Sequence, residues 1–328
     1  MHDALTVLLA LLSALGNGAA SVLQRRAAME QEQEQEQERQ REQAGRGIGR
    51  RAGQTLLRLA RLLRRPFWLA GGAAMVVSAV AQVGALAVGR LSVVQPLLVT
   101  ELLFTLVVGS LVFRHRPDGR TWLAFVTLAA GLALFLVAAD PSHGQSTAKN
   151  GRWLPVGLLA ALAVGVLTAV ARALRGPARA AVLGCAAAAG FACTAALIKE
   201  FTGRFSGGVA AVFTSWPLYA VCGVGLLSFL LLQSTLRAGT LAASQPALTL
   251  GDALLSIVLG WVLFGERVAL GPRIVPEAIG VVLMAAGIVG LTHSPAVADG
   301  WDTATSTPTD RPARPPGATR RTESGGAS

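Results

Sequence analysis

The sequence predicts an all-α, polytopic membrane protein: a transmembrane helix bundle of about nine spans. Only 14% of its residues are charged and 52% are hydrophobic, whereas soluble domains carry roughly 25% charged residues. The apolar residues form runs of roughly 20, the length that a helix needs to cross the hydrocarbon core. Two of these runs also carry the same polar residues at a constant spacing, which indicates an internal repeat.

The first predicted span covers residues 4–24 and is followed by the positive pair Arg25-Arg26. A cleaved signal peptide is disfavoured, because no Lys or Arg precedes the apolar run. In the insert that follows, residues 25–66, a Gln/Glu alternation is expected to be solvated and flexible rather than a continuation of the helix. In residues 54–65 the Leu and Arg side chains fall on opposite faces of a helix. We expect this segment to form a basic amphipathic helix on the inner membrane surface, held by anionic lipid.

Eight further apolar runs follow, and then a polar tail. The predicted spans are residues 67–88, 92–113, 120–139, 153–171, 179–198, 210–232, 240–264 and 274–292. Residues 293–328 are rich in Pro, Thr, Ser, Gly and Arg, and we expect them to form a disordered cytoplasmic tail.

An odd number of spans puts the termini on opposite sides of the membrane, and charge indicates which side is which. Lys and Arg gather between residues 25 and 65, which lie in the cytoplasm if the N-terminus lies outside. The net charge of +11 therefore reflects arginines in the segments between spans. No basic stripe with interleaved aromatics accompanies it, so a nucleic-acid partner is excluded. We expect a multi-pass protein of the cell (plasma) membrane.

The internal repeat pairs the third span with the eighth. Each copy has a Gln-Pro pair, then an acid, then a hydroxyl residue four positions later on the same helix face. With residues 67–139 completing the first repeat and 179–292 forming the second, the span at 153–171 is a linker, and the two four-helix repeats are inverted. The matched pairs are Gln82 with Gln233, Gln95 with Gln245, Pro96 with Pro246, Glu101 with Asp252, and Thr105 with Ser256.

Glu101 and Asp252 both fall near the middle of their predicted spans. A carboxyl group inside the bilayer is costly, and it is a functional hypothesis by default. We interpret the pair as cavity-facing groups that bind a cation, a proton or a cationic substrate. The alternative is that each acid is hydrogen-bonded to a helix neighbour, such as Thr105 or Ser256, and only ties helices together.

The Gln-Pro pairs have two interpretations. Pro96 and Pro246 could break or kink their helices and free carbonyl groups for a site, or they could simply mark the start of a span. The glutamines are candidate polar liners of the cavity, while interhelical hydrogen bonds explain Gln82 and Gln233 equally well. The four candidate liners are Gln82, Gln95, Gln233 and Gln245.

Three segments, Leu91–Glu101, Leu241–Asp252 and Leu259–Val268, carry a resemblance to the drug/metabolite transporter superfamily. The chain is most similar to its nine-span, EamA-related bacterial members and to the NIPA-type magnesium transporter branch. The resemblance implies secondary-active transport around a central cavity between inverted halves, with no bound cofactor. The first repeat departs from the family pattern, because His115 stands where the family often has the glutamate that is Glu266 in the second repeat.

We therefore expect a secondary transporter of a small metabolite or cation, with proton coupling as an option. A magnesium-type divalent-cation permease is the alternative within transport, and a non-transporting membrane scaffold is the alternative from another class. An enzyme and a metal site are not expected, because the four His lie outside the predicted spans. Glu200 and Glu266 lie at predicted outer ends and are expected to be solvated. The expected partners are a substrate, the lipid bilayer and a second copy of the chain in a homodimer.

Overall fold

The computed structural model describes residues 2–43, 66–113, 118–139, 144–148, 151–205, 214–238, 241–266 and 274–293. In these residues the fold is an all-helical bundle, and nine helical segments are long and apolar enough to cross a membrane, which confirms the predicted fold class. The amphipathic helix predicted at 54–65 and the tail after residue 293 lie outside the described residues. The helices are α1 (His2–Gln43), α3 (Pro66–Val88), α4 (Leu91–Leu98), α5 (Glu101–Phe113), α6 (Gly119–Ala139), α7 (Trp153–Ala173), α8 (Gly176–Thr202), α10 (Trp216–Ala238), α11 (Leu241–Phe264) and α12 (Ile274–Thr292).

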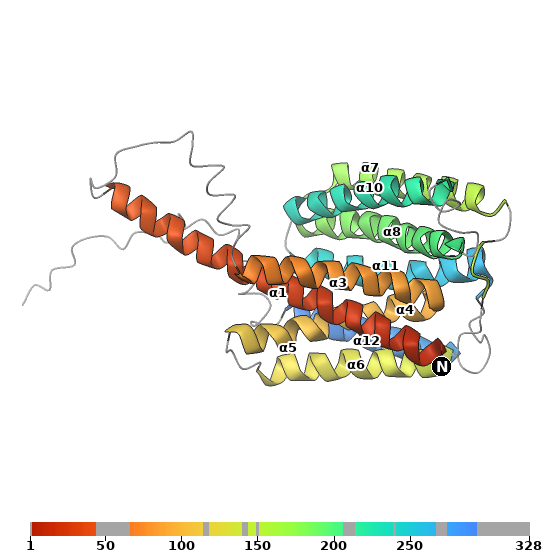
Figure 1. Cartoon of the computed structure of the whole chain (residues 1–328), viewed down its shortest axis with the longest axis horizontal. Coiled ribbons are helices and arrows are strands. Elements are labelled where there is room, and N and C mark those ends of the chain that lie inside the picture. The colour runs from red at the N-terminus through yellow and green to blue at the C-terminus, as the bar shows by residue number, and fades with distance from the viewer. Residues whose placement is uncertain are drawn as a thin grey trace, which may run out of the picture.

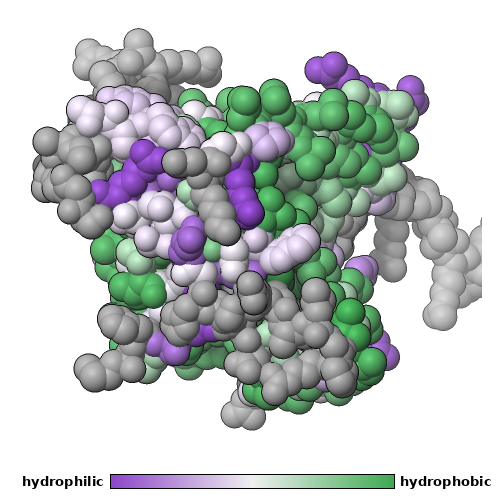
Figure 2. Space-filling model, turned by 90° about the vertical axis from the view of Figure 1, so that its right-hand side faces the viewer, coloured by the Kyte–Doolittle hydropathy of each residue, from purple (hydrophilic) through white to green (hydrophobic). Residues whose placement is uncertain are grey.

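The membrane helices lie side by side and run back and forth between two ends of the bundle (Figure 1). We name these ends by residue. The Glu266 end holds the start of α1, the turn between α3 and α4, and the end of α11. The Arg25 end is the opposite one, where α3, α6 and α8 begin and α10 ends. Viewed from the Glu266 end, hydrophilic residues concentrate on the end face and hydrophobic ones on the flanks, as a membrane-spanning bundle requires (Figure 2).

Helix packing follows the predicted repeat. In the first repeat α1 packs on α3 and α5, and in the second α8 packs in the same way on α10 and α11. Across the repeats α6 packs on α12 and α4 packs on α11, whereas α7 packs on α8 and is otherwise largely exposed. A close contact recurs too: a methyl group at Gly16 would lie 3.0 Å from the Cβ of Ser78, and one at Gly190 would lie 3.1 Å from that of Ser228. Ser78 and Ser228 are 150 residues apart, the same spacing as the two Gln-Pro pairs.

The largest difference from the predicted elements is the length of α1. The helix continues past the membrane span to Gln43, so the prediction that the Gln/Glu run at 30–43 is flexible and does not continue the helix is wrong (Figure 1). Gln, Glu, Arg and Met are good helix formers, and neither Gly nor Pro occurs between Ala27 and Gln43. Arg26 and Glu30 also form an ion pair one turn apart. These local preferences extend the helix that the membrane span has already nucleated.

The third span is interrupted, whereas the eighth is continuous. α4 ends two residues after Pro96, and α5 begins at Glu101. The Thr100 hydroxyl donates to the carbonyl of Leu97 at 2.6 Å, a local bond that competes with the helical backbone pattern. The predicted break at Pro246 is wrong, because α11 runs unbroken through it. The residues that align with Thr100 are Leu250 and Gly251, and neither has a hydroxyl group to hold such a turn.

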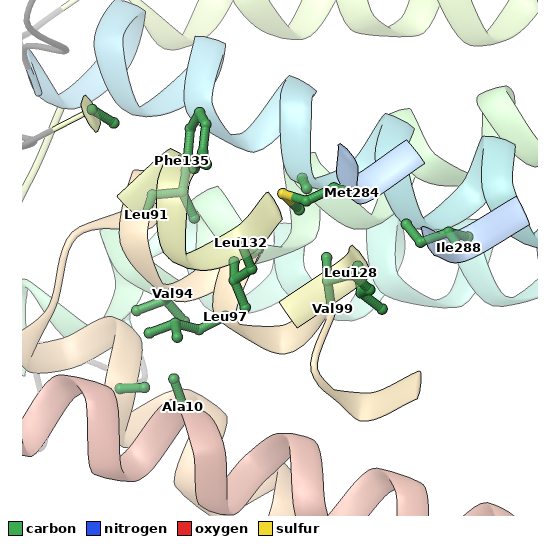
Figure 3. Close-up of a cluster of buried hydrophobic side chains, with 14 of the residues drawn as sticks. Ala10, Leu91, Val94, Leu97, Val99, Leu128, Leu132, Phe135, Met284 and Ile288 are labelled. Carbon is green, nitrogen blue, oxygen red and sulfur yellow. The ribbon is translucent and has the colours of Figure 1, made fainter. Parts of the chain in front are cut away.

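The main apolar core draws buried side chains from both repeats. They come from α1, α3, α4, α5, α6, α8, α11 and α12, and several of them converge between the ribbons (Figure 3). Those labelled in the figure are Ala10, Leu91, Val94, Leu97, Val99, Leu128, Leu132, Phe135, Met284 and Ile288.

Asp118 caps the amino terminus of α6. Its carboxylate accepts hydrogen bonds from the hydroxyl and from the backbone N–H of Thr121, and these bonds lower the pKa of Asp118. The group is exposed, so the cap should make a small contribution to stability. This contribution is present when the carboxylate is charged and is lost as the pH falls through the lowered pKa. Asp118→Ala should therefore lower the melting temperature slightly at pH 7, and the difference from wild type should shrink below about pH 4. A difference that grew on acidification would contradict this assignment.

Candidate functional site

Glu101 begins α5 and faces α1. The amide of Asn17 donates to its Oε2 atom at 3.0 Å. The Thr105 hydroxyl, which could have paired with this acid, instead donates to the backbone carbonyl of Glu101 at 2.8 Å. Close approach of the two helices depends on Gly18, where a methyl group would lie 2.9 Å from the backbone nitrogen of Thr105. The acid is thus held by an amide from another helix and not by its own helix.

A cleft of about 350 Å³ lies beside this acid and is located towards the Arg25 end. One of its walls comes from α1, where Asn17, Ser21 and Arg25 recur every four residues on the face that meets α5. Another wall comes from the second repeat, so the cleft lies between the two halves. Its lining residues are Ser21, Arg25, Glu101, Leu102, Thr105, Leu236 and Gln245.

Asp252, the counterpart of Glu101, does not line this cleft. Its Oδ1 atom is sealed from solvent and, among the described residues, has no hydrogen-bond partner; the same holds for the hydroxyl of Ser256. Gly16 of α1 and Gly190 of α8 make corresponding contacts with Ser78 and Ser228. When the two helices are aligned on these glycines, Phe191 takes the position of Asn17. The second acid therefore lacks the amide that holds the first.

The structure brings three of the predicted site residues together, namely Glu101, Thr105 and Gln245. Gln95 is buried, and its side-chain nitrogen has no hydrogen-bond partner in the described part of the chain. The remaining two glutamines, in α3 and α10, are half-buried and lie outside the cleft lining. Within the described residues, no group of three or more His, Cys, Asp or Glu side chains could hold a metal ion.

Sequence reasoning missed Asn17 and Arg25. Asn17 is an amide flanked by two glycines within the first apolar run, and this pattern could have identified it as a polar contact between closely packed helices. Arg25 was interpreted only as a topological anchor, because its place in the cleft depends on the packing of α1 against the other helices.

Glu200 and Glu266, at the Glu266 end, are both buried, so the prediction that these two glutamates are solvated is wrong. Glu266 is 0% exposed and accepts hydrogen bonds from the backbone N–H groups of Leu91 at 2.8 Å and Ser92 at 2.9 Å. Its Oε1 atom also lies 3.5 Å from the ammonium group of Lys199. The acid comes directly after the end of α11, but the folded bundle places it on the amino terminus of α4.

Glu200 has a local role at the same end. It is 2% exposed and accepts hydrogen bonds from the backbone N–H of Ala148 at 2.6 Å and from Arg204 at 2.8 Å. Arg204 lies one turn further along the chain, and Ala148 belongs to the segment before α7. Glu200 therefore fixes this segment against α8.

Comparison with known proteins identifies one relative of unassigned function. No family model matches the chain. An uncharacterized protein of Corynebacterium glutamicum is 26% identical over 212 residues, which make up 64% of this chain and 73% of that protein. No solved structure matches. The function must therefore be argued from the site itself.

Proposed function

We propose that this protein is a secondary-active transporter that moves a small metabolite or a cation across the cell membrane by alternating access. The observation that carries the proposal is the cleft between the repeats, which is lined in part by Glu101 and lies towards the Arg25 end. At the Glu266 end, buried side chains join the same repeats. A site reached from one end at a time, between two halves of inverted order, is what alternating access requires.

The cleft walls favour some substrates over others. Glu101 and the neighbouring amide suit a positively charged or hydrogen-bond-donating group, and Gln245 adds a further amide from the opposite repeat. Arg25 shares the cleft and would repel a divalent ion. We therefore favour a metabolite, a monovalent cation or a proton over Mg²⁺, although a partly hydrated Mg²⁺ needs few protein ligands.

Asp252 has a role in the same proposal. In a transporter of inverted repeats the two halves exchange conformations during the cycle, so Asp252 would face the cavity when it opens at the Glu266 end. The positive-inside bias favours a cytoplasmic location for the Arg25 end. A scaffold would need neither acid.

Blocking the cleft tests the proposal. Ser21 is exposed and lines the cleft, so Ser21→Cys can be labelled with a bulky maleimide after Cys185, Cys193 and Cys222 are replaced by Ala. In proteoliposomes, the labelled variant should lose at least about nine-tenths of any gradient-driven uptake seen without label, because the adduct fills most of a cleft of about 350 Å³. The probes are Mg²⁺, protons read with an entrapped pH dye, and a panel of radiolabelled small metabolites.

The matched control is Arg175→Cys. This residue is exposed at the Arg25 end, between α7 and α8, and lies outside the cleft. Its labelling should leave uptake unchanged. Equal inhibition at both positions would show that the adduct does not act through the cleft, and the absence of flux for every probe would favour the scaffold.

A further inference from the structure

A buried ionic junction at the Glu266 end joins the two repeats. Glu266 follows α11 and Lys199 belongs to α8, so both charged groups come from the second repeat. The groups that they hold all belong to the first repeat. Glu266 accepts from the N–H groups that begin α4, and Lys199 donates to the carbonyl of Gly89, just before α4. The Lys199 ammonium also lies 5.3 Å from the centre of the Phe264 ring.

The turn after α11 has the conformation that delivers this carboxylate. Gly265 has φ +67°, in the left-handed region that favours glycine, and its N–H donates back to the carbonyl of Trp261. The N–H of Glu266 then donates to the carbonyl of Gly260 at 3.1 Å. A methyl group at Gly260 would lie 2.5 Å from the carboxylate oxygen of Glu266, so Gly260 makes room for the junction, whereas Gly265 provides the turn.

The contacts of the junction depend on one another. When seated, the carboxylate satisfies two free N–H groups at a helix amino terminus, where the helix dipole favours negative charge. The pair with Lys199 compensates for burying both charges. Separating the repeats at this end would require Glu266, Lys199 and the start of α4 to be hydrated together, so a partly open arrangement leaves buried groups unpaired.

In the sequence, the position that the repeat aligns with Glu266 holds no acid. The repeat spacing aligns Glu266 with His115, and the sequence there reads Arg114-His115-Arg116, without a carboxylate. The amino terminus of α11, the counterpart of that of α4, thus has no acid at the corresponding position. This asymmetry agrees with the location of the cleft, which lies towards the Arg25 end.

We propose that Glu266, seated on the amino terminus of α4 and held by Lys199, is a latch that keeps the Glu266 end closed and makes the cleft-open arrangement the resting state. This inference rests on the proposed transport function, in that the latch has a role only if the bundle opens alternately at its two ends. Glu266 and Lys199 are then positioning residues that set the balance between the two arrangements without contacting the substrate.

Cysteine accessibility at both ends tests the latch without any substrate. One reporter is Ser92→Cys, whose small side chain is buried beside the latch and whose hydroxyl has no hydrogen-bond partner among the described residues. The other is Ser21→Cys in the cleft. Both are built in the variant without native cysteines and labelled in membranes with an impermeant maleimide, applied from the side that each reporter faces.

Glu266→Gln keeps the shape of the side chain and removes its charge. Loss of one charge-assisted contact should speed labelling of the Ser92→Cys reporter by about tenfold and slow labelling of the Ser21→Cys reporter. Lys199→Met should act in the same direction and provides a second route if the first variant does not fold. The matched control is Glu200→Gln, which removes an equally buried carboxylate at the same end and should leave both rates unchanged.

Opposite changes at the two reporters would support a population shift. Unchanged labelling rates would overturn the latch. Faster labelling of both reporters would overturn it too, because that result would mean that the variant loosens the bundle and does not shift it from one arrangement to the other. If the rates shift in opposite directions but no probe crosses the membrane, the latch stands and the proposed transport fails. If transport occurs and the rates do not shift, only the latch fails.

Discussion

Replacing Glu101 by Gln should reduce gradient-driven flux by about a hundredfold. The substitution removes the charge that would hold a cationic or hydrogen-bond-donating substrate. A hydrogen bond to a charged group contributes about 1.5–3 kcal/mol, and about 1.4 kcal/mol corresponds to a factor of ten. Glu101 is the carboxyl group of the cleft lining, and its Asn17 partner holds it in place. The variant should still fold, since Gln keeps an oxygen that can accept from Asn17. Initial rates in proteoliposomes give the measurement.

The control for this experiment is Glu200→Gln. Glu200 is a buried acid outside the cleft, so its substitution should keep flux within about twofold of wild type.

Asp252→Asn should also lower flux, because we place Asp252 at the cavity in the opposite arrangement. If Glu101→Gln retained more than half of the wild-type rate, the assignment of this acid to the transport site would be wrong.

Gly287→Ala should destabilise the bundle, whereas the same substitution at Gly165 should be neutral or stabilising. A methyl group at Gly287 would lie 2.6 Å from both the backbone nitrogen and the Cβ of Leu128, so α6 and α12 would have to separate. Overpacking of this kind costs about 1–3 kcal/mol, and a backbone neighbour cannot move aside as a flexible side chain can. A methyl group at Gly165 meets nothing within 4 Å, and Ala is a better helix former than Gly by about 1 kcal/mol.

Thermal unfolding in detergent, followed by the loss of the monodisperse peak in size-exclusion chromatography, compares the two variants directly. Both variants replace Gly by Ala inside a membrane helix, so the change in helix propensity is the same in both. A difference between their melting temperatures therefore reports the contact that each methyl group makes. Melting temperatures that shifted in the same direction would show that the contact between α6 and α12 is not as close as described.

Much of the architecture follows from local properties of the chain. A helix in lipid must satisfy its own backbone and needs about 20 apolar residues, so runs of that length identify the membrane helices without knowledge of their neighbours. The constant spacing of the Gln-Pro pairs likewise revealed a repeat that the packing of α1 and α8 on their own partner helices now reflects. Local signals misled in three places. Good helix formers extend α1 to Gln43 despite the low complexity of the sequence, α11 runs unbroken through Pro246, and the helix predicted at 210–232 lies at Trp216–Ala238.

The site was only partly accessible from the sequence. Polar residues in apolar runs identified Glu101, Thr105 and Gln245, and all three line the same cleft. Asn17 and Arg25 join them because Gly18 lets α1 approach α5, a contact between segments that are far apart in the chain.

By itself, the sequence determined that this is a multi-pass helical membrane protein with paired acids in two related spans. Only the tertiary structure decided that the acids differ: Glu101 lies beside a cleft and an amide, whereas one carboxylate oxygen of Asp252 is buried with no hydrogen-bond partner among the described residues. It also decided that Glu266, expected in solvent, is buried on the start of α4. The physical reason is that the place of a residue in a span depends on hydropathy, which is local. The partner of a buried charge depends on which helix ends the packing brings together.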